Sequence, residues 1–439
     1  MTCPNRTADL PSSFLRLARR LAGDRQGASM VAFAVSLPML AGGVGMGVET
    51  GLWYMTKRQA QTAADAAALS GALELRRGDD TAIRAAAARE ATRNGFQAGT
   101  SAMGTTGVAT ARVTLAGGRQ GVEVVVTRQT RLLFSSLFLT APVSIAARAV
   151  AAVENGGDAC VLALDRSASG ALTITGSTQV SMAGCVLASN SAANGALSVG
   201  GSASLGAEGL WTVGTIAGAD SPKVSLTGGD SARVQRAWPL PDPYAHLDLS
   251  APAGCTRNSK LNVNGPQTIS PGTYCNDIQV VSNGVLTLRP GVYHLKNASL
   301  TVGGQGTVRC DCLPGQGVTI ILTGTSPGTV DIRGGASVVL SAPSAATDPY
   351  RGVIFAQSRQ AAVGGDNKFN GGSGMVLQGA VYFPNQSVDW LGNDTSNLLG
   401  CAKIIGRTVT FSGNSRLANA GCAALGTEPM QTRSARLVE

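Results

Sequence analysis

Few residues in this sequence have types and spacings that could do chemistry, and the first group lies in the stretch "DRSAS". Asp165, Ser167 and Ser169 offer a carboxylate and two hydroxyls at alternate positions, directly after the apolar run "CVLAL". Oxygen ligands of this kind suit Mg²⁺, which requires an octahedral shell of oxygens. These three residues supply only part of such a shell, so the stretch alone predicts no complete metal site.

The same D-x-S-x-S spacing is similar to the metal-ion-dependent adhesion site of von Willebrand A domains. In that fold an amphipathic helix follows the motif at once, whereas "GALTITGSTQVSM" follows it here, with β-branched residues and glycines. We therefore expect Asp165 and Ser167 to hydrogen-bond the backbone of a turn between strands. A metal-dependent adhesin of the von Willebrand A type stays open as an alternative function.

Catalytic residues are harder to find. Both histidines stand in unrelated contexts, His246 after the proline-rich "WPLPDPYA" and His294 in the strand-like "GVYHL". Polysaccharide cleavage needs two carboxylates that converge to within about 5–10 Å. The aspartates that could provide them stand singly, three of them beside Gly or Asn: Asp277, Asp311, Asp331, Asp366, Asp389 and Asp394. We expect no enzyme and no cofactor, with a carbohydrate-binding or polysaccharide-cleaving protein as the alternative.

Cysteines point to an oxidising compartment, because eight of the nine follow residue 159. An even number of cysteines in an exported region predicts a disulfide framework, although eight of them allow 105 pairings. Proximity in the sequence favours the pairs Cys160–Cys185, Cys255–Cys275 and Cys401–Cys422. This leaves Cys310 and Cys312 in "CDC", which we expect to be structural or free because no further metal ligand stands nearby.

Composition limits the class of protein that must position these residues. The 439 residues include 57 glycines, and only 14% are charged and 4% aromatic. Small and turn-forming residues therefore dominate, which disfavours a helical or doubly wound enzyme. The net charge of +9 comes almost entirely from residues 1–153, with 17 Lys/Arg against 9 Asp/Glu. A nucleic-acid-binding protein would place basic and aromatic residues on its folded domain, so we expect no nucleic-acid partner.

From about residue 154 the chain reads as short strands separated by turns. Apolar segments such as "ALTI", "VLTL", "GVTIILTG" and "AVYF" alternate with Gly, Ser, Asn and Thr, without helical periodicity. The "GAL" starts at Gly170 and Gly195 lie 25 residues apart. Spacing in this range is typical of stacked β-structure. We predict a mainly-β domain over residues 154–425, a right-handed parallel β-helix (solenoid), with a β-sandwich as the alternative and a flexible tail over residues 426–439.

The N-terminal part contains a candidate membrane helix. Residues 28–48 form 21 consecutive uncharged residues, which at about 1.5 Å each span roughly the 30 Å of a bilayer core. The pattern continues into an Ala-rich helix, unlike a cleaved signal peptide. Arginines before the span (Arg16, Arg19, Arg20, Arg25) predict a cytoplasmic N-terminus, and Trp53 and Tyr54 stand where an interfacial belt is expected. Gly43 and Gly47 have the G-x-x-x-G spacing that permits helix association, so self-association stays open.

These residues carry a resemblance. The stretch "DRQGASMVAFAVSLPML…GVETGLWYMTKRQAQTAADAAALSGA" resembles the N-terminal segment of TadE/TadG-like proteins of Flp (Tad) pilus assembly. The matching positions are Gly27, Pro38, Glu49, Gln61 and the run from Ala63 to Ala72 that includes Asp65. Prepilin-like members carry a Glu five residues after the Gly, where this chain has Ala32. The departure favours the larger TadG-like type, which stays anchored in the membrane.

The resemblance implies a role in assembling, anchoring or stabilising a pilus and implies no chemistry. We expect a cytoplasmic basic tail (1–27), a transmembrane helix (28–52), a helical extension with a small α/β region (53–153) and then the β-domain. The expected location is the bacterial inner membrane, crossed once, with the C-terminal domain in the periplasm. Expected partners are the membrane and other pilus-assembly or envelope proteins.

Overall fold

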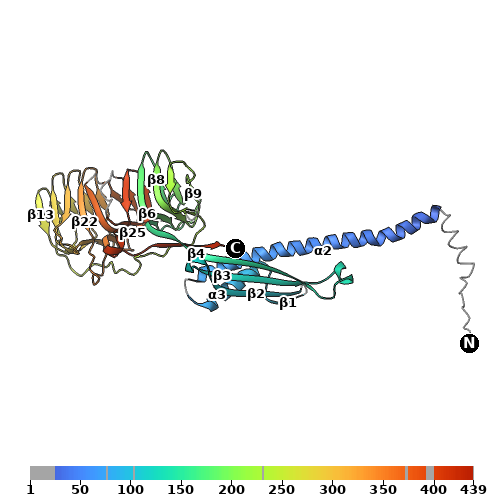
Figure 1. Cartoon of the computed structure of the whole chain (residues 1–439). Helices are drawn as coiled ribbons and strands as arrows, with labels where there is room; N and C mark the ends of the chain where they lie inside the picture. The colour runs from blue at the N-terminus through green and yellow to red at the C-terminus, as the bar shows by residue number, and fades with distance from the viewer. Residues whose placement is uncertain are drawn as a thin grey trace, which may run out of the picture. The chain divides into compact units, whose positions relative to one another are not determined.

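The computed structural model describes residues 25–75, 78–101, 104–229, 232–370, 374–391 and 400–438 (Figure 1). The chain divides into two compact units, and each is described by itself. Unit 1 comprises Met1–Glu154 with Ala435–Glu439, and unit 2 comprises Asn155–Ser434. The basic flank with Arg16, Arg19 and Arg20 lies outside the described residues.

Unit 1 begins with a helix of 50 residues, α2 (Arg25–Glu74). Ala, Leu, Met and Gln are strong helix formers and dominate its sequence, and Pro38 lies inside it. Its first half exposes large apolar side chains, and the helix is long and apolar enough to cross a membrane. A second helix, α3 (Asp80–Arg93), follows Gly78, which has a positive φ of 72°. The Asp79 carboxylate caps α3 by accepting a hydrogen bond of 2.8 Å from the Thr81 N–H.

An antiparallel sheet packs against these helices. Strand β2 pairs with β1 and β3, and β3 pairs with β4, all antiparallel. Alternate β3 residues point inward, so that Val122, Val124 and Val126 are fully buried with alanines of α2. The strands and connecting 3₁₀ turns are β1 (Gly99–Ser101), β2 (Gly104–Thr114), η2 (Ala116–Gly118), β3 (Gln120–Thr130), η3 (Phe134–Leu137) and β4 (Val143–Ala163).

Unit 2 is built almost entirely from short strands that pair in parallel with strands one repeat away. Apart from the pairs that β26 and β27 make with β4, β5 and β6, partners lie from 17 positions apart, as for Leu261 and Ile278, to 37 apart, as for Asp331 and Lys368. The strands form three columns, in which each column holds one strand of each repeat; we call one repeat of three strands a rung. Column A follows the order β12 (Leu261–Val263), β15 (Ile278–Val280), β18 (Leu300–Val302), β21 (Val330–Ile332), β24 (Asp366–Phe369), β25 (Met375–Trp390), β26 (Ala402–Phe411), β5 (Leu172–Ile174), β7 (Leu197–Val199) and β9 (Ile216–Ala217).

The other two columns follow the same parallel rule. Column B contains β13 (Pro266–Ile269), β16 (Val285–Leu288), β19 (Thr307–Cys310), β22 (Ser337–Ser341) and the start of β25; β27 (Ser415–Ala418), β6 (Gln179–Ser189), β8 (Ser204–Thr212) and β10 (Val224–Leu226) pair in a second series. Column C contains β14 (Gly272–Tyr274), β17 (Gly291–Lys296), β20 (Val318–Thr323), β23 (Val353–Gln357), parts of β25, β26, β4, β6 and β8, and β11 (Arg233–Val234).

The core of unit 2 lies between the columns. Inward positions of column A place Val302, Ile332, Phe369 and Trp390 in successive rungs, all fully buried. The rings of Phe369 and Trp390 stack with centroids 5.4 Å apart. This ladder of apolar side chains is what the short alternating segments of the sequence encode.

Rungs do not follow chain order through the unit. Strand β26 pairs in parallel with β25 on one side and with β4 and β5 on the other, so the last rung lies against the first. The chain therefore enters unit 2 in the middle of the stack and builds outward to β11. It then crosses to the far end and returns rung by rung from β12 to β26.

The crossing segment, residues 235–260, forms no named strand and packs on the outside of column C. Leu240, Tyr244, Leu247 and Leu249 are buried against strands β4, β6, β20, β23, β25 and β26. This cover explains why column C strands read as unbroken apolar runs: β20 ("VTIILT") is buried at every position because both of its faces are covered.

The structure joins the three cysteine pairs favoured by sequence proximity, Cys160–Cys185, Cys255–Cys275 and Cys401–Cys422, and also bonds Cys310 to Cys312. One expectation needs correction. Residues 426–439, expected as a flexible tail, include strand β28 (Gln431–Leu437), which pairs with β4 and follows the short helix α4 (Cys422–Leu425). Met430 and Thr432 are buried, which is the physical reason this end is ordered.

Candidate functional site

The carboxylate of Glu49 lies at the centre of the candidate site, on α2 in unit 1. Only 2% of Glu49 is exposed, because the 3₁₀ turn η3 lies over it. Its oxygens accept hydrogen bonds from the Leu133 N–H (2.9 Å), the Ser135 N–H (2.7 Å) and the Ser135 hydroxyl (2.7 Å). Glu49 therefore holds the loop between β3 and β4 by charge-assisted bonds, which are the stronger kind of hydrogen bond.

One helical turn before Glu49, the ring of Phe134 from the same loop packs on Gly45. A Cβ at Gly45 would lie 2.5 Å from two ring atoms of Phe134, so only glycine leaves room for this contact. Gly45 is buried, whereas Val44 and Met46 beside it are exposed. The loop thus reaches down beside the uncharged span of the helix.

Further along α2, polar side chains attach the helix to β4. The Lys57 ammonium donates to the Ala146 carbonyl, and Gln61 Nε2 donates to the Arg148 carbonyl at 3.0 Å. Gln61 also donates to Asp65 Oδ1 at 2.8 Å, one turn later. Four residues of helix rise about 6 Å and two residues of strand about 6.8 Å, so helix and strand stay in step.

The alanine run after Gln61 forms a close helix–sheet interface. Ala63, Ala64, Ala67 and Ala68 are fully buried against the sheet and α3. A Cβ at Gly71 would lie 3.0 Å from Val122. Small side chains let the helix backbone approach the sheet, and these alanines therefore serve in packing.

Two other motif positions and the G-x-x-x-G pair lie in the first half of α2. Gly27 and Pro38 lie within α2. A Cβ at Gly43 or Gly47 would meet no atom within 4 Å in the described part of the chain. Both glycines are thus available on the helix surface, and self-association through them stays a prediction.

Comparison with protein families matches this part of the chain. Residues 27–89 match the family described as "Flp pilus-assembly TadE/G-like", and residues 66–151 match "Tad-like Flp pilus-assembly". Residues 27–151 are TadE/TadG-like. Searches of curated proteins and of solved structures find no match to the chain.

Three features of the family motif contact the β3–β4 hairpin: the acidic residue Glu49, Gln61 and the alanine run. The family-like segment thus forms most of an α/β platform on a long helix, and Ala435 and Leu437 of β28 pack against its core. The sequence motif alone gave no sign that Glu49 binds the loop, since the two are 84–86 positions apart. The apolar run "LLFSSLFL" between the more polar segments on either side was the available signal.

The D-x-S-x-S residues of unit 2 form a turn. Asp165 Oδ1 accepts from the N–H groups of Ser167 (2.8 Å) and Ala168 (2.7 Å), and Oδ2 pairs with Arg407 at 2.7 Å. Burial raises the pKa of the Asp165 carboxyl, but these backbone donors and Arg407 outweigh burial and hold the pKa below its usual range. Ser169 donates separately to the Asn194 carbonyl. Both carboxylate oxygens of Asp165 already have partners within the protein.

Other ionisable groups in unit 2 form hydrogen bonds where the first and last rungs pair. The buried Lys403 ammonium donates to Asp158 Oδ2 and to the Glu428 carbonyl, both at 2.8 Å. Met430 N–H donates to Asp158 Oδ1 at 2.6 Å. Burial lowers the pKa of Lys403 despite the Asp158 carboxylate beside it. These contacts join the first strand, the last rung and the C-terminal segment.

The histidines stand apart from one another. His246 lies on the crossing segment, and its Nε2 is 4.0 Å from Glu428 Oε1. Burial lowers the pKa of His294, which neighbouring Asp248 opposes. Among the residues that the structure describes, no group of three or more His, Cys, Asp or Glu side chains could hold a metal ion.

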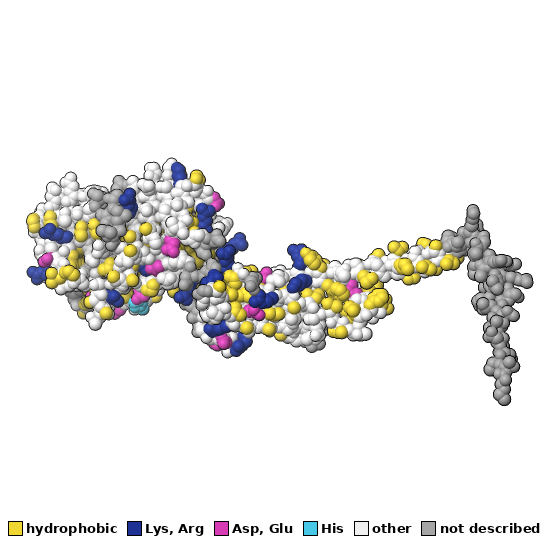
Figure 2. Space-filling model, viewed as in Figure 1, with side chains coloured by type: hydrophobic (Ala, Val, Ile, Leu, Met, Phe, Trp, Pro, Cys, Tyr) yellow, Lys and Arg dark blue, Asp and Glu magenta, His cyan; other side chains and the backbone are white. Residues whose placement is uncertain are grey.

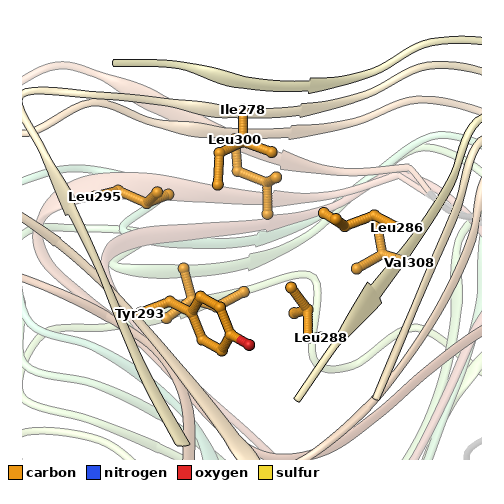
Figure 3. Close-up of a pocket in the computed structure, with 8 residues that line it drawn as sticks. Ile278, Leu286, Leu288, Tyr293, Leu295, Leu300 and Val308 are labelled. Carbon is orange, nitrogen blue, oxygen red and sulfur yellow. The ribbon is translucent and has the colours of Figure 1, made fainter. Parts of the chain in front are cut away.

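A small cavity lies inside unit 2, at the end of the stack that contains β15 to β20 (Figure 3). The side chains drawn in Figure 3 are apolar apart from the hydroxyl of Tyr293, which donates toward the carbonyls of Ile269 (3.0 Å) and Arg289 (2.8 Å). The lining therefore offers a ligand no free polar group. It is lined by Ile278, Leu286, Leu288, Tyr293, Leu295, Leu300, Val308 and Ile320.

Proposed function

We propose that this protein is a membrane-anchored, non-catalytic structural component of a Tad/Flp-type pilus-assembly or envelope-anchoring system. The observation that carries the proposal is the use of the family motif: Glu49, Gln61 and the alanine run fasten a membrane-length helix to a folded platform. Glu49, Gln61, Asp65 and the buried alanines of the motif are engaged in hydrogen bonds or in packing. Such an element transmits position and force, and requires no substrate.

The proposed placement is a single pass through the bacterial inner membrane with the N-terminus in the cytoplasm and unit 2 in the periplasm. Four disulfides in unit 2 support an oxidising compartment for that unit. Partners would then be other pilus-assembly or envelope proteins.

A deletion strain tests the function. We expect loss of surface pili, restored by the full chain and not by a chain carrying both Gln61→Ala and Ala64→Leu, which loosens the helix from the platform. The matched control is Thr62→Ala, at an exposed position of the same helical turn. Normal pili with lost attachment would make the protein an anchor; unchanged pili and attachment would refute the proposal.

We further propose that unit 2 is a right-handed parallel β-helix. Parallel registers from rung to rung in three columns support this architecture over two face-to-face antiparallel sheets. Spin labels at Asn262 and Ser198, on outward positions of column A eight strands apart, should lie about 38 Å from each other at ~4.8 Å per strand. A separation below about 20 Å would favour a sandwich.

A second candidate function is glycan binding along column A. Its outward positions carry polar side chains in register, among them Asp331, Lys368 and Asp389 in three successive rungs. Burial, followed by the charge of Asp366, raises the pKa of Asp389. Titration of the full chain with envelope glycans tests the candidate: binding that Lys368→Ala abolishes supports it, and no binding removes it.

A further inference from the structure

The loop between β3 and β4 exposes a cluster of large apolar side chains. Leu137 is 79% exposed and Phe138 73%, and Leu133, Phe134 and Leu139 are each more than 40% exposed. These five residues, which we call the apolar tip, lie within a single seven-residue stretch around η3. Soluble surfaces rarely gather so many large apolar side chains in so short a segment, and such a cluster marks an interaction surface.

The depth of this tip along α2 is fixed by its contacts. Phe134 packs on Gly45, and Glu49 binds the N–H groups of Leu133 and Ser135. Gly45 lies four residues before Glu49 on α2, which is about 6 Å along the helix axis. It belongs to the uncharged stretch of residues 28–48 whose exposed side chains include Val44, Met46 and Val48. The tip is therefore continuous with the apolar surface of the helix, as the hydrophobic side chains around the loop and helix illustrate (Figure 2).

Exposed basic side chains begin beyond the outer end of the apolar stretch. Lys57 and Arg58, two turns beyond Glu49, and Arg131 at the base of the loop are exposed. Trp53 and Tyr54 lie between these basic residues and the apolar stretch. This order, apolar then aromatic then basic, is the one that suits a bilayer core, its interface and anionic headgroups.

We propose that the apolar tip inserts into the outer leaflet of the membrane beside the helix, so that unit 1 contacts the bilayer at two points. The occupant of the surface is the lipid bilayer, with anionic headgroups facing Lys57, Arg58 and Arg131. Glu49 acts as a positioning residue: by binding the backbone of the loop it keeps the tip at membrane depth and has its own charge satisfied there. The inference rests on the proposed membrane anchoring. Two contacts fix the tilt of the platform on the membrane, whereas a single helix leaves it free to swing.

The test places an environment-sensitive NBD fluorophore on single added cysteines of the full chain, in a Cys3→Ser background that keeps the eight disulfide-bonded cysteines. The protein is reconstituted in vesicles of phosphatidylethanolamine and phosphatidylglycerol that contain a doxyl-lipid quencher. Labels go to Leu137 in the tip, to Leu40 in the exposed part of α2, and to Gln120 as the matched control. Gln120 is exposed at the opposite end of β3, about 34 Å along the strand from the end that leads into the tip.

We expect the labels at Leu137 and Leu40 to be quenched at least threefold more than the label at Gln120. Quenching at Leu40 with none at Leu137 would overturn the inference and leave the membrane anchor standing. Absence of quenching at Leu40 would remove the anchor and the inference together. A Leu137 label that is shielded from water yet unquenched by lipid would show a protein covering the tip, which also overturns the proposal.

Discussion

At the residue scale, Glu49 shows how a motif position acquires its role from residues far away in the chain. Its carboxylate accepts three hydrogen bonds from loop residues that lie 84–86 positions later. Hydrogen bonds to a charged group contribute about 1.5–3 kcal/mol each, so their joint loss frees the loop.

We therefore expect Glu49→Ala to raise the hydrogen-exchange rates of the Leu133 and Ser135 amides by about tenfold or more, as a loss of ~1.4 kcal/mol in local protection would do. Exchange measured by mass spectrometry on the reconstituted full chain checks this. The control is Glu90→Ala, a carboxylate of the same unit that pairs with Arg93 on α3. Equal exchange in both variants would show that Glu49 does not hold the loop.

Asp165 gives a second prediction at this scale, through pH. Its pKa is lowered in the folded chain, so the folded state favours the charged form and gains stability above the ordinary carboxyl value near 3.8. That gain is lost as pH falls through the lowered folded pKa. We expect the thermal midpoint to drop more between pH 5 and pH 2 in the parent than in Asp165→Asn. Asp220→Asn, at a fully exposed carboxylate, is the control; identical pH slopes in parent and Asp165→Asn would contradict the assignment.

At the element scale, the alanine-rich helices are specified by the space available to them. Ala87 of α3 is fully buried with the alanines of α2, while Ala85 on the same helix is exposed. Leucine is as good a helix former as most residues, so a change to Leu at either position tests packing with little effect on helix propensity.

We expect Ala87→Leu to destabilise unit 1 by about 1–3 kcal/mol through overpacking, and Ala85→Leu to stay within about 0.5 kcal/mol of the parent. Denaturant unfolding followed through exchange at β3 amides reports on unit 1 alone. If both variants behave alike, the helix–sheet contact is looser than the structure has it.

Elements could be predicted from the sequence where their signal is local. The uncharged stretch 28–48 and the short β-segments after residue 154 each follow from composition within a few residues. The turn at Asp165 followed from its neighbours "DRSAS" and the strands around it. The loop held by Glu49 could not be predicted, because the partners share no local pattern and meet only through the fold of the hairpin.

The order of rungs could not be predicted either, and the reason is physical. The inward residues of β26, Val409 and Phe411, pair with Val388 and Trp390 on one side and with Leu172 and Ile174 on the other. All of these present the same apolar–polar–apolar pattern, so periodicity does not distinguish a neighbour in sequence from the first rung of the unit. Likewise β28 looked like a tail because its alternation is short, and its partner β4 lies at the other end of the unit.

At the scale of the whole chain, the first and last rungs of unit 2 lie next to each other, because β26 pairs with β4 and β5. The crossing segment then becomes the only covalent link between residues 155–234 and residues 261–434. No disulfide joins the two parts: Cys160–Cys185 lies in the first, Cys310–Cys312 and Cys401–Cys422 lie in the second, and Cys255–Cys275 bonds the end of the crossing segment to the second. Parallel pairing of β26 with β4 and β5, together with Lys403 on Asp158, holds the two parts without it.

Cutting the crossing segment therefore tests the rung order. With a protease site inserted between Ala253 and Gly254, which are exposed, the cleaved chain should elute as one species in native chromatography and as two fragments on a denaturing, non-reducing gel. If the rungs were stacked in chain order, the two fragments would touch only through the rungs on either side of the cut. The β26–β5 interface, which joins the fragments here, would be absent. Adding Lys403→Ala removes the cation from Asp158, which keeps its hydrogen bonds from Met430 and Asn419, and should weaken the association of the cleaved fragments. Lys368→Ala, at an exposed lysine of the same unit, should leave them together. Separation of the fragments in the cleaved parent itself would mean that the first and last rungs do not pair.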